Sequence, residues 1–130
     1  METKSKEQWY DDCIQLHKAG KTDEAAGELE KLIKVWPDYG LAYLALAVFY
    51  EKMGKADEVM ETMHTACEKE PDDPFYYTAF SALAIRAGNH SVAESALMKA
   101  QESHFAEQLK KMQEDAEEAS SGSDPEKSEE

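Results

Sequence analysis

The chain has 130 residues, with 14 Lys+Arg against 28 Asp+Glu, so its formal net charge is −14. That length suits one ordinary domain, and the acidic balance argues against binding nucleic acid or an anionic membrane surface, because both would repel the protein. No run approaches the roughly 18 apolar residues of a membrane span, and the first residues lead into no apolar signal core. These features predict a cytoplasmic protein. Its two cysteines, Cys13 and Cys67, are too few for a disulfide scaffold.

Capping signals predict where helices begin. Ser5 followed by Gln8, and Ser91 followed by Glu94, fit the capping-box pattern. Further caps are expected at Thr22, Asp38 and Asp73, the last followed by Pro74 at the first helical position. No segment alternates with the period of a strand. The chain is therefore expected to be all-α, with helices over 6–19, 22–35, 39–53, 56–69, 74–87 and 91–102 and a final helical stretch over 105–118.

Glycines and prolines recur at a fixed spacing. Gly20, Gly54 and Gly88 lie 34 residues apart, and Pro37 and Pro71 share that period. A glycine after an apolar-periodic run ends a helix, because it accepts the left-handed conformation at little cost. A 34-residue period of this kind predicts stacked helical hairpins.

The register of the three repeats resembles that of the tetratricopeptide repeat family. The matching side chains of the first repeat are Trp9, Cys13, Leu16, Ala25, Leu29, Leu32 and Pro37. Those of the second are Tyr43, Leu46, Ala47, Tyr50, Val59, Met63, Ala66 and Pro71, and those of the third are Tyr77, Phe80, Ser81, Ala84, Ala93, Leu97 and Ala100. The resemblance implies a right-handed superhelical array of three hairpins, with repeats near 6–39, 40–73 and 74–104 in a domain spanning 1–119.

Both ends of this domain depart from the family pattern. Asp12 stands where a leucine would pack against a preceding repeat, so it marks the exposed N-terminal end of the array. Phe105 stands where a third proline would end the last repeat. The apolar stripe over 105–118 is rotated from that of Ala93, Leu97 and Ala100, which favours a bend near 101–104 and a capping helix folded back over the third repeat. A continuous helix is the alternative, since nothing between residues 91 and 120 breaks one. Residues 120–130 carry no apolar side chain and are expected to form a disordered acidic tail.

No catalytic motif is present, so the chain is predicted not to be an enzyme and to need no cofactor. The best candidate for a metal site pairs Cys13 with His17 and His64 with Cys67, each pair on one helix face. However, Cys13 occupies the small packing position between paired helices, and the two pairs belong to different repeats. Buried thiols that behave as small hydrophobes are the favoured interpretation, and no metal site is predicted.

The third predicted helix, residues 40–50, is apolar all round, so it must be covered on more than one side. In the family the first helix of each hairpin lines a concave groove. The resemblance therefore implies an apolar groove centred on Leu44 and Val48. Its side chains are expected to be Tyr10, Ile14, His17, Leu41, Leu44, Val48, Phe75, Thr78, Ala82 and Ile85. The alternative is that neighbouring first helices cover part of this stripe themselves.

The expected function is a non-catalytic adaptor or chaperone-like module that binds a helical or extended apolar segment of a partner protein in this groove. The positions with which some family members grip a terminal carboxylate hold Tyr10, Ile14, Ala45, Phe75 and Ala79, none of which can do so. The apolar lining is more similar to that of secretion chaperones. The alternative function is a structural homodimer in which a second copy covers the groove.

Overall fold

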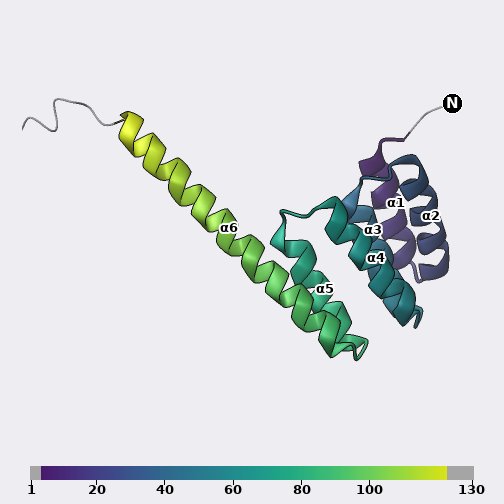
Figure 1. Cartoon of the computed structure of the whole chain (residues 1–130). Helices are drawn as coiled ribbons and strands as arrows, with labels where there is room; N and C mark the ends of the chain where they lie inside the picture. The colour runs from purple at the N-terminus through teal and green to yellow at the C-terminus, as the bar shows by residue number, and fades with distance from the viewer. Residues whose placement is uncertain (1–3, 123–130) are drawn as a thin grey trace, which may run out of the picture.

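The structure is a computed structural model that describes residues 4–122. Six helices and no strand lie in this range (Figure 1). They are α1 (Lys6–Lys18), α2 (Thr22–Val35), α3 (Gly40–Lys52), α4 (Ala56–Lys69), α5 (Pro74–Arg86) and α6 (His90–Gly122). No helix in the described range is long and apolar enough to cross a membrane.

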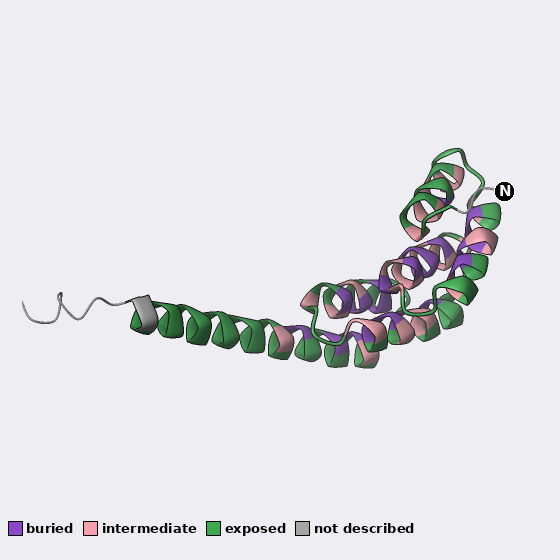
Figure 2. Ribbon diagram, turned by 90° about the horizontal axis from the view of Figure 1, so that it is seen from above, coloured by how far each residue is buried: buried purple, intermediate pink, exposed green. Residues whose placement is uncertain are grey.

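The helices form three hairpins, α1/α2, α3/α4 and α5/α6, which stack in chain order along a curved array (Figures 1 and 2). Apolar side chains at the repeat positions hold the hairpins together. Leu29, Leu32 and Met63 are completely buried, as is Cys13 in the small packing position of α1. One core cluster joins the first hairpin to α3, and a second joins α3 and α4 to α5 and α6. The all-α array of three hairpins is therefore confirmed.

The three repeat glycines close the hairpins. Gly20, Gly54 and Gly88 have φ values of 83°, 77° and 79°, in the left-handed region that favours glycine. The residue after each glycine then donates its backbone N–H to a carbonyl of the preceding helix, over N···O distances of 2.9, 2.9 and 2.8 Å. These bonds satisfy carbonyl groups that the end of a helix leaves open. The expected helix stops are confirmed at all three positions.

Two of the expected caps form as predicted. Ser5 accepts from the Gln8 backbone N–H, and the Gln8 side chain accepts from the Ser5 N–H, each over 3.2 Å. The Asp73 carboxylate accepts from the Phe75 N–H over 3.0 Å, with Pro74 opening α5. Both caps lie next to the helix they start and need no distant partner.

Three expected caps are wrong. Thr22 lies inside α2, where its hydroxyl is 3.0 Å from the His17 ring, and Asp38 forms an ion pair with Lys69. Both side chains therefore bond to another helix. At the start of α6 the cap is Asn89, whose side-chain oxygen accepts from the Val92 N–H over 3.2 Å, and Ser91 already lies within the helix.

The last helix is continuous. α6 runs from His90 to Gly122 without interruption, so the expected bend and the folded-back capping helix over 105–118 are wrong. The segment 101–104 contains neither glycine nor proline, and an uninterrupted helix keeps every backbone hydrogen bond across it. α6 also includes the first three residues of the expected tail. The remainder, 123–130, lies outside the described residues.

Candidate partner-binding site

The ten residues expected to line a groove come from α1, α3 and α5, and we call their surface the first-helix face. The structure places them in two groups by exposure. Tyr10, Ile14, His17, Leu41, Leu44 and Val48 are half-buried, whereas Phe75, Thr78, Ala82 and Ile85 are exposed. The face is therefore closed toward α1 and open toward α5.

Aromatic packing closes the α1 end. The ring of Tyr10 meets that of Tyr39 edge-on at 6.0 Å between centroids. His17 stacks on Phe49 at 4.6 Å, and its Nδ1 lies 3.0 Å from the Thr22 hydroxyl. His17 therefore belongs to the packing between hairpins. Tyr39, which directly precedes α3, was not identified from the sequence, because only its contact with Tyr10 brings it to this surface.

The expected centre of the face lies between the two core clusters. Val48 packs against the cluster that contains Cys13, and Leu44 packs against the cluster that contains Met63. Each side chain still keeps part of its surface accessible. Leu44 and Val48 therefore use part of their surface to pack between helices, as the alternative expected. The accessible part continues the apolar surface toward α5.

The α5 end is open and apolar. Phe75 and Ile85 are 56% and 55% exposed, and with the exposed Thr78 and Ala82 they form a continuous row on α5. The Thr78 hydroxyl donates to the Pro74 carbonyl over 2.9 Å, so its hydrogen-bonding capacity is partly used within the helix. Beside Ile85, Arg86 pairs with Glu51 of α3 over 2.7 Å. The two charges neutralise each other at this edge. The periodicity of the helices did not predict this ion pair.

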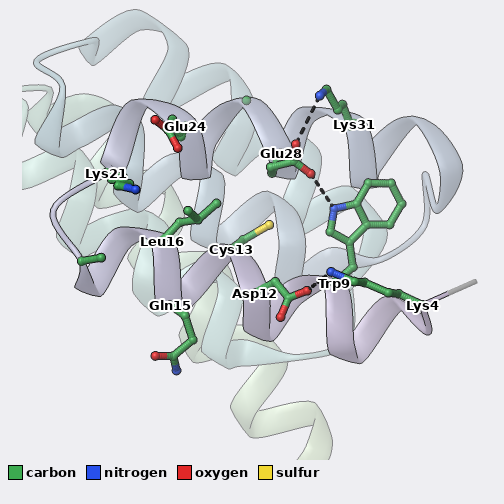
Figure 3. Close-up of a pocket in the computed structure, with 12 residues that line it drawn as sticks. Lys4, Trp9, Asp12, Cys13, Gln15, Leu16, Lys21, Glu24, Glu28 and Lys31 are labelled. Carbon is green, nitrogen blue, oxygen red and sulfur yellow. Dashed lines mark hydrogen bonds and ion pairs between the residues drawn. The ribbon is translucent and has the colours of Figure 1, made fainter. Parts of the chain in front are cut away.

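A separate cavity of about 720 Å³ lies at the N-terminal end of the array, between α1 and α2 (Figure 3). Four of its charged groups form two ion pairs. Lys4 pairs with the exposed Asp12, and Glu28 accepts from the Trp9 indole N–H over 3.1 Å and from Lys31 over 3.2 Å (Figure 3). The indole hydrogen bond, followed by that from Lys31, lowers the pKa of the Glu28 carboxyl. The position of Asp12 at an exposed end of the array agrees with the expectation from the sequence.

The cysteines are packing residues. Cys13 and Cys67 are 0% and 5% exposed, and burial raises the pKa of both thiols to about 11. Both thiols are therefore protonated at neutral pH, in the form that does not bind metals. His17 is held by Phe49 and Thr22, and His64 points to Glu68 over 3.2 Å. Within residues 4–122 no group of three or more His, Cys, Asp or Glu is placed to hold a metal ion.

Comparison with known proteins agrees with this geometry. A tetratricopeptide repeat profile matches residues 16–84, which is more than half of the chain. The chain belongs to the tetratricopeptide repeat family. No curated protein sequence matches it.

Several solved tetratricopeptide repeat structures share the fold. MamA superposes with a TM-score of 0.72 at 21% identity, over 83% of this chain and 63% of MamA. The Yersinia enterocolitica type III secretion translocator chaperone SycD, in its alternative dimer, gives 0.69 at 19%, over 87% of this chain and 89% of SycD. PcrH, solved with the chaperone binding region of PopD, gives 0.66 at 19%, over 77% of this chain and 75% of PcrH. The chain spans 55–63% of four of the MamA structures, which is less than two thirds of their length.

Proposed function

We propose that this protein is a non-catalytic interaction module whose first-helix face binds an apolar segment of a partner protein, in the manner of an adaptor or chaperone. The observation that carries the proposal is the exposure of Phe75 and Ile85 on α5, where they continue the apolar row of α3. Exposed apolar side chains gathered on one surface of a folded protein are typical of an interaction site.

The chemistry of the face determines the kind of segment it would accept. Its side chains are aliphatic or aromatic, and the charges at one edge are already joined in the Arg86–Glu51 pair. An apolar helix or extended strand would bury its side chains there without leaving a charge unpaired. PcrH, which shares the fold, is solved with a segment of another protein, and this similarity supports a protein ligand here as well.

Affinity capture with a matched pair of variants tests the proposal. Phe75→Asp with Ile85→Lys places charges at two exposed positions, so we expect the fold to survive and the captured partner to be lost. Val35→Lys is the control, because Val35 is 58% exposed at the end of α2, outside the first-helix face. If the Phe75→Asp/Ile85→Lys variant captures the same partner as the wild type, the proposed site is wrong.

The centre of the face is tested separately. Leu44→Glu with Val48→Lys places an acid four residues before a base, which supports the helix. Because both side chains also pack on the core clusters, we expect a loss of about 1–3 kcal/mol in the free energy of unfolding together with loss of the partner. A homodimer that buries this face, the alternative function, would instead dissociate in both double variants, and light scattering would detect that change.

A further inference from the structure

The third repeat lacks the cover that the first two receive. Leu29, Met63 and Leu97 occupy the same position of successive repeats, 34 residues apart. The first two are completely buried, but Leu97 is 46% exposed. In the first two repeats the next hairpin packs over this position, whereas α6 is the last helix of the described range (Figure 1). α6 therefore presents apolar surface at the end of the array.

A second face of α6, turned by about 90° from Leu97, carries an apolar stripe along the helix. Met98, Phe105, Leu109 and Met112 are 61%, 62%, 42% and 66% exposed. At 100° per residue they fall within a sector about 60° wide. The sector lies roughly opposite the buried residues Ala93, Ala96 and Ala100, which pack on the α5 side. The spacings of four and three residues after Phe105 are those of a helix that packs against another helix.

The rest of the described chain covers little of the second half of α6, although the turn between α4 and α5 lies near Glu107. Every residue from His104 to Ser120 is exposed, and α5 is the one helix with which α6 makes extensive contact (Figure 2). Most of the stability of a helix in a protein comes from packing of its apolar face. A partner for the stripe would supply the packing that this segment lacks.

Apart from Glu102, the charged side chains between residues 98 and 116 avoid the stripe. Its immediate flanks carry uncharged side chains, which are Gln101, Ala106, Gln108 and Gln113. The charged groups Glu107, Lys110, Lys111 and Glu114 lie on the other side of the helix. This distribution matters for self-association, because two copies that each carry a net charge of −14 can approach closely only where the local surface is uncharged.

We propose that a second copy of this chain covers the stripe, with the two α6 helices packed antiparallel about a two-fold axis near residue 107. In this register Phe105 faces Leu109 of the second copy, and Met98 faces its Ala116. Glu102, the one charged side chain in the stripe, then lies opposite Met112 and beside the Gln113 amide, which can donate to its carboxylate. A parallel pair would place Glu102 directly against Glu102, which disfavours that arrangement.

The rest of the molecule is compatible with this dimer. α5 packs on the opposite side of α6, so the two arrays would lie at opposite ends of the helix pair and outside it. The overlap from 98 to 116 is about 28 Å long, which makes the interface a small one. The first-helix face stays open in both copies, so this dimer differs from one in which a second copy covers that face.

Sedimentation equilibrium over about 1–500 µM tests the proposal in a range suited to a small interface. We expect the full chain to dimerise reversibly. Leu109→Lys should weaken the dimer at least about tenfold, because it buries an unpaired charge. Glu114→Gln, which changes the net charge by the same amount on the opposite side of α6, should leave the dimer unchanged. Glu102→Leu should tighten it, because it removes the carboxylate from the stripe.

Spin labels test the orientation of the pair. Ser95→Cys provides an exposed thiol, whereas Cys13 and Cys67 are buried and protonated, so a single label can be attached. The antiparallel register places the two labelled sites about 36 Å apart along the helix axis, against about 10 Å for a parallel pair. The proposal would be overturned if the protein stayed monomeric at every concentration, or if Leu109→Lys left the dimer dissociation constant unchanged. A distance of about 10 Å between the labels would overturn it as well. None of these outcomes bears on the first-helix face.

Discussion

The turn glycines show how single positions set the geometry of the repeats. Gly54 adopts a φ of 77°, and a Cβ atom built there would meet nothing within 4 Å. A larger side chain would therefore fit at this turn. The positive φ of the backbone is what restricts the choice of residue. A β-branched side chain is strained in the left-handed region, whatever room surrounds it.

We accordingly expect Gly54→Val to lower the free energy of unfolding by about 1–3 kcal/mol, measured by chemical denaturation. Gly27→Ala is the matched control, because Gly27 lies within helix α2 and a Cβ there also meets nothing within 4 Å. That change should raise stability by about 0.5–1 kcal/mol. An unchanged midpoint for Gly54→Val would contradict the left-handed turn.

The hydrogen bond between Trp9 and Glu28 should give stability a measurable pH dependence. Because it is the largest contribution that lowers the pKa of Glu28, its stabilisation is present above the usual value of 4.5 and is lost as pH falls through the lowered value. Trp9→Phe should therefore cost more stability at pH 7 than at pH 4. The pH-dependent part should be small, since the Glu28 side chain is 38% exposed. In a Glu28→Gln background the cost of Trp9→Phe should no longer vary with pH in this range.

Residue-level expectations were correct where the partner is close in sequence. The Ser5–Gln8 box and the Asp73 cap use groups two or three residues away, and both formed. Asp38 instead pairs with Lys69, 31 residues further along the chain. Competition of this kind depends on how the hairpins stack, and local sequence patterns do not report it.

At the scale of whole elements, the helices and their 34-residue period could be predicted, but the path of α6 could not. The rotation between its two apolar stripes suggested a bend. A bend, however, breaks backbone hydrogen bonds of the helix, so it is stable only if new packing contacts compensate for that loss of free energy. The face of the third repeat gained no such cover, and Leu97 stayed 46% exposed.

Truncation measures how much the end of α6 contributes to the fold. Removal of residues 105–130 deletes no buried residue of the described chain, so the melting temperature at low protein concentration should stay nearly the same while the helical signal falls. Removal of residues 97–130 also deletes Ala100, which is 5% exposed, and should destabilise the third hairpin. A large loss of stability in the shorter truncation would mean that 105–120 packs on the array after all.

For the whole molecule, the sequence predicted which residues share the first-helix face but not how open each one is. Periodicity places Tyr10 and Phe75 at similar angles on their helices. Whether a side chain is covered depends on the aromatic contacts of neighbouring segments, such as that between Tyr10 and Tyr39. The open part of the face consequently lies on α5, and the expected centre at Leu44 and Val48 is only half accessible.

The central claim, that this face binds apolar segments, is tested most directly by selecting binders from a peptide display library and measuring their affinity for wild type and variant. We predict that the enriched peptides carry apolar residues spaced for one helix face or one strand face. Phe75→Asp with Ile85→Lys should weaken them at least about tenfold, and Val35→Lys should not. Enriched peptides without an apolar pattern, or peptides that bind the double variant as tightly as the wild type, would contradict the account.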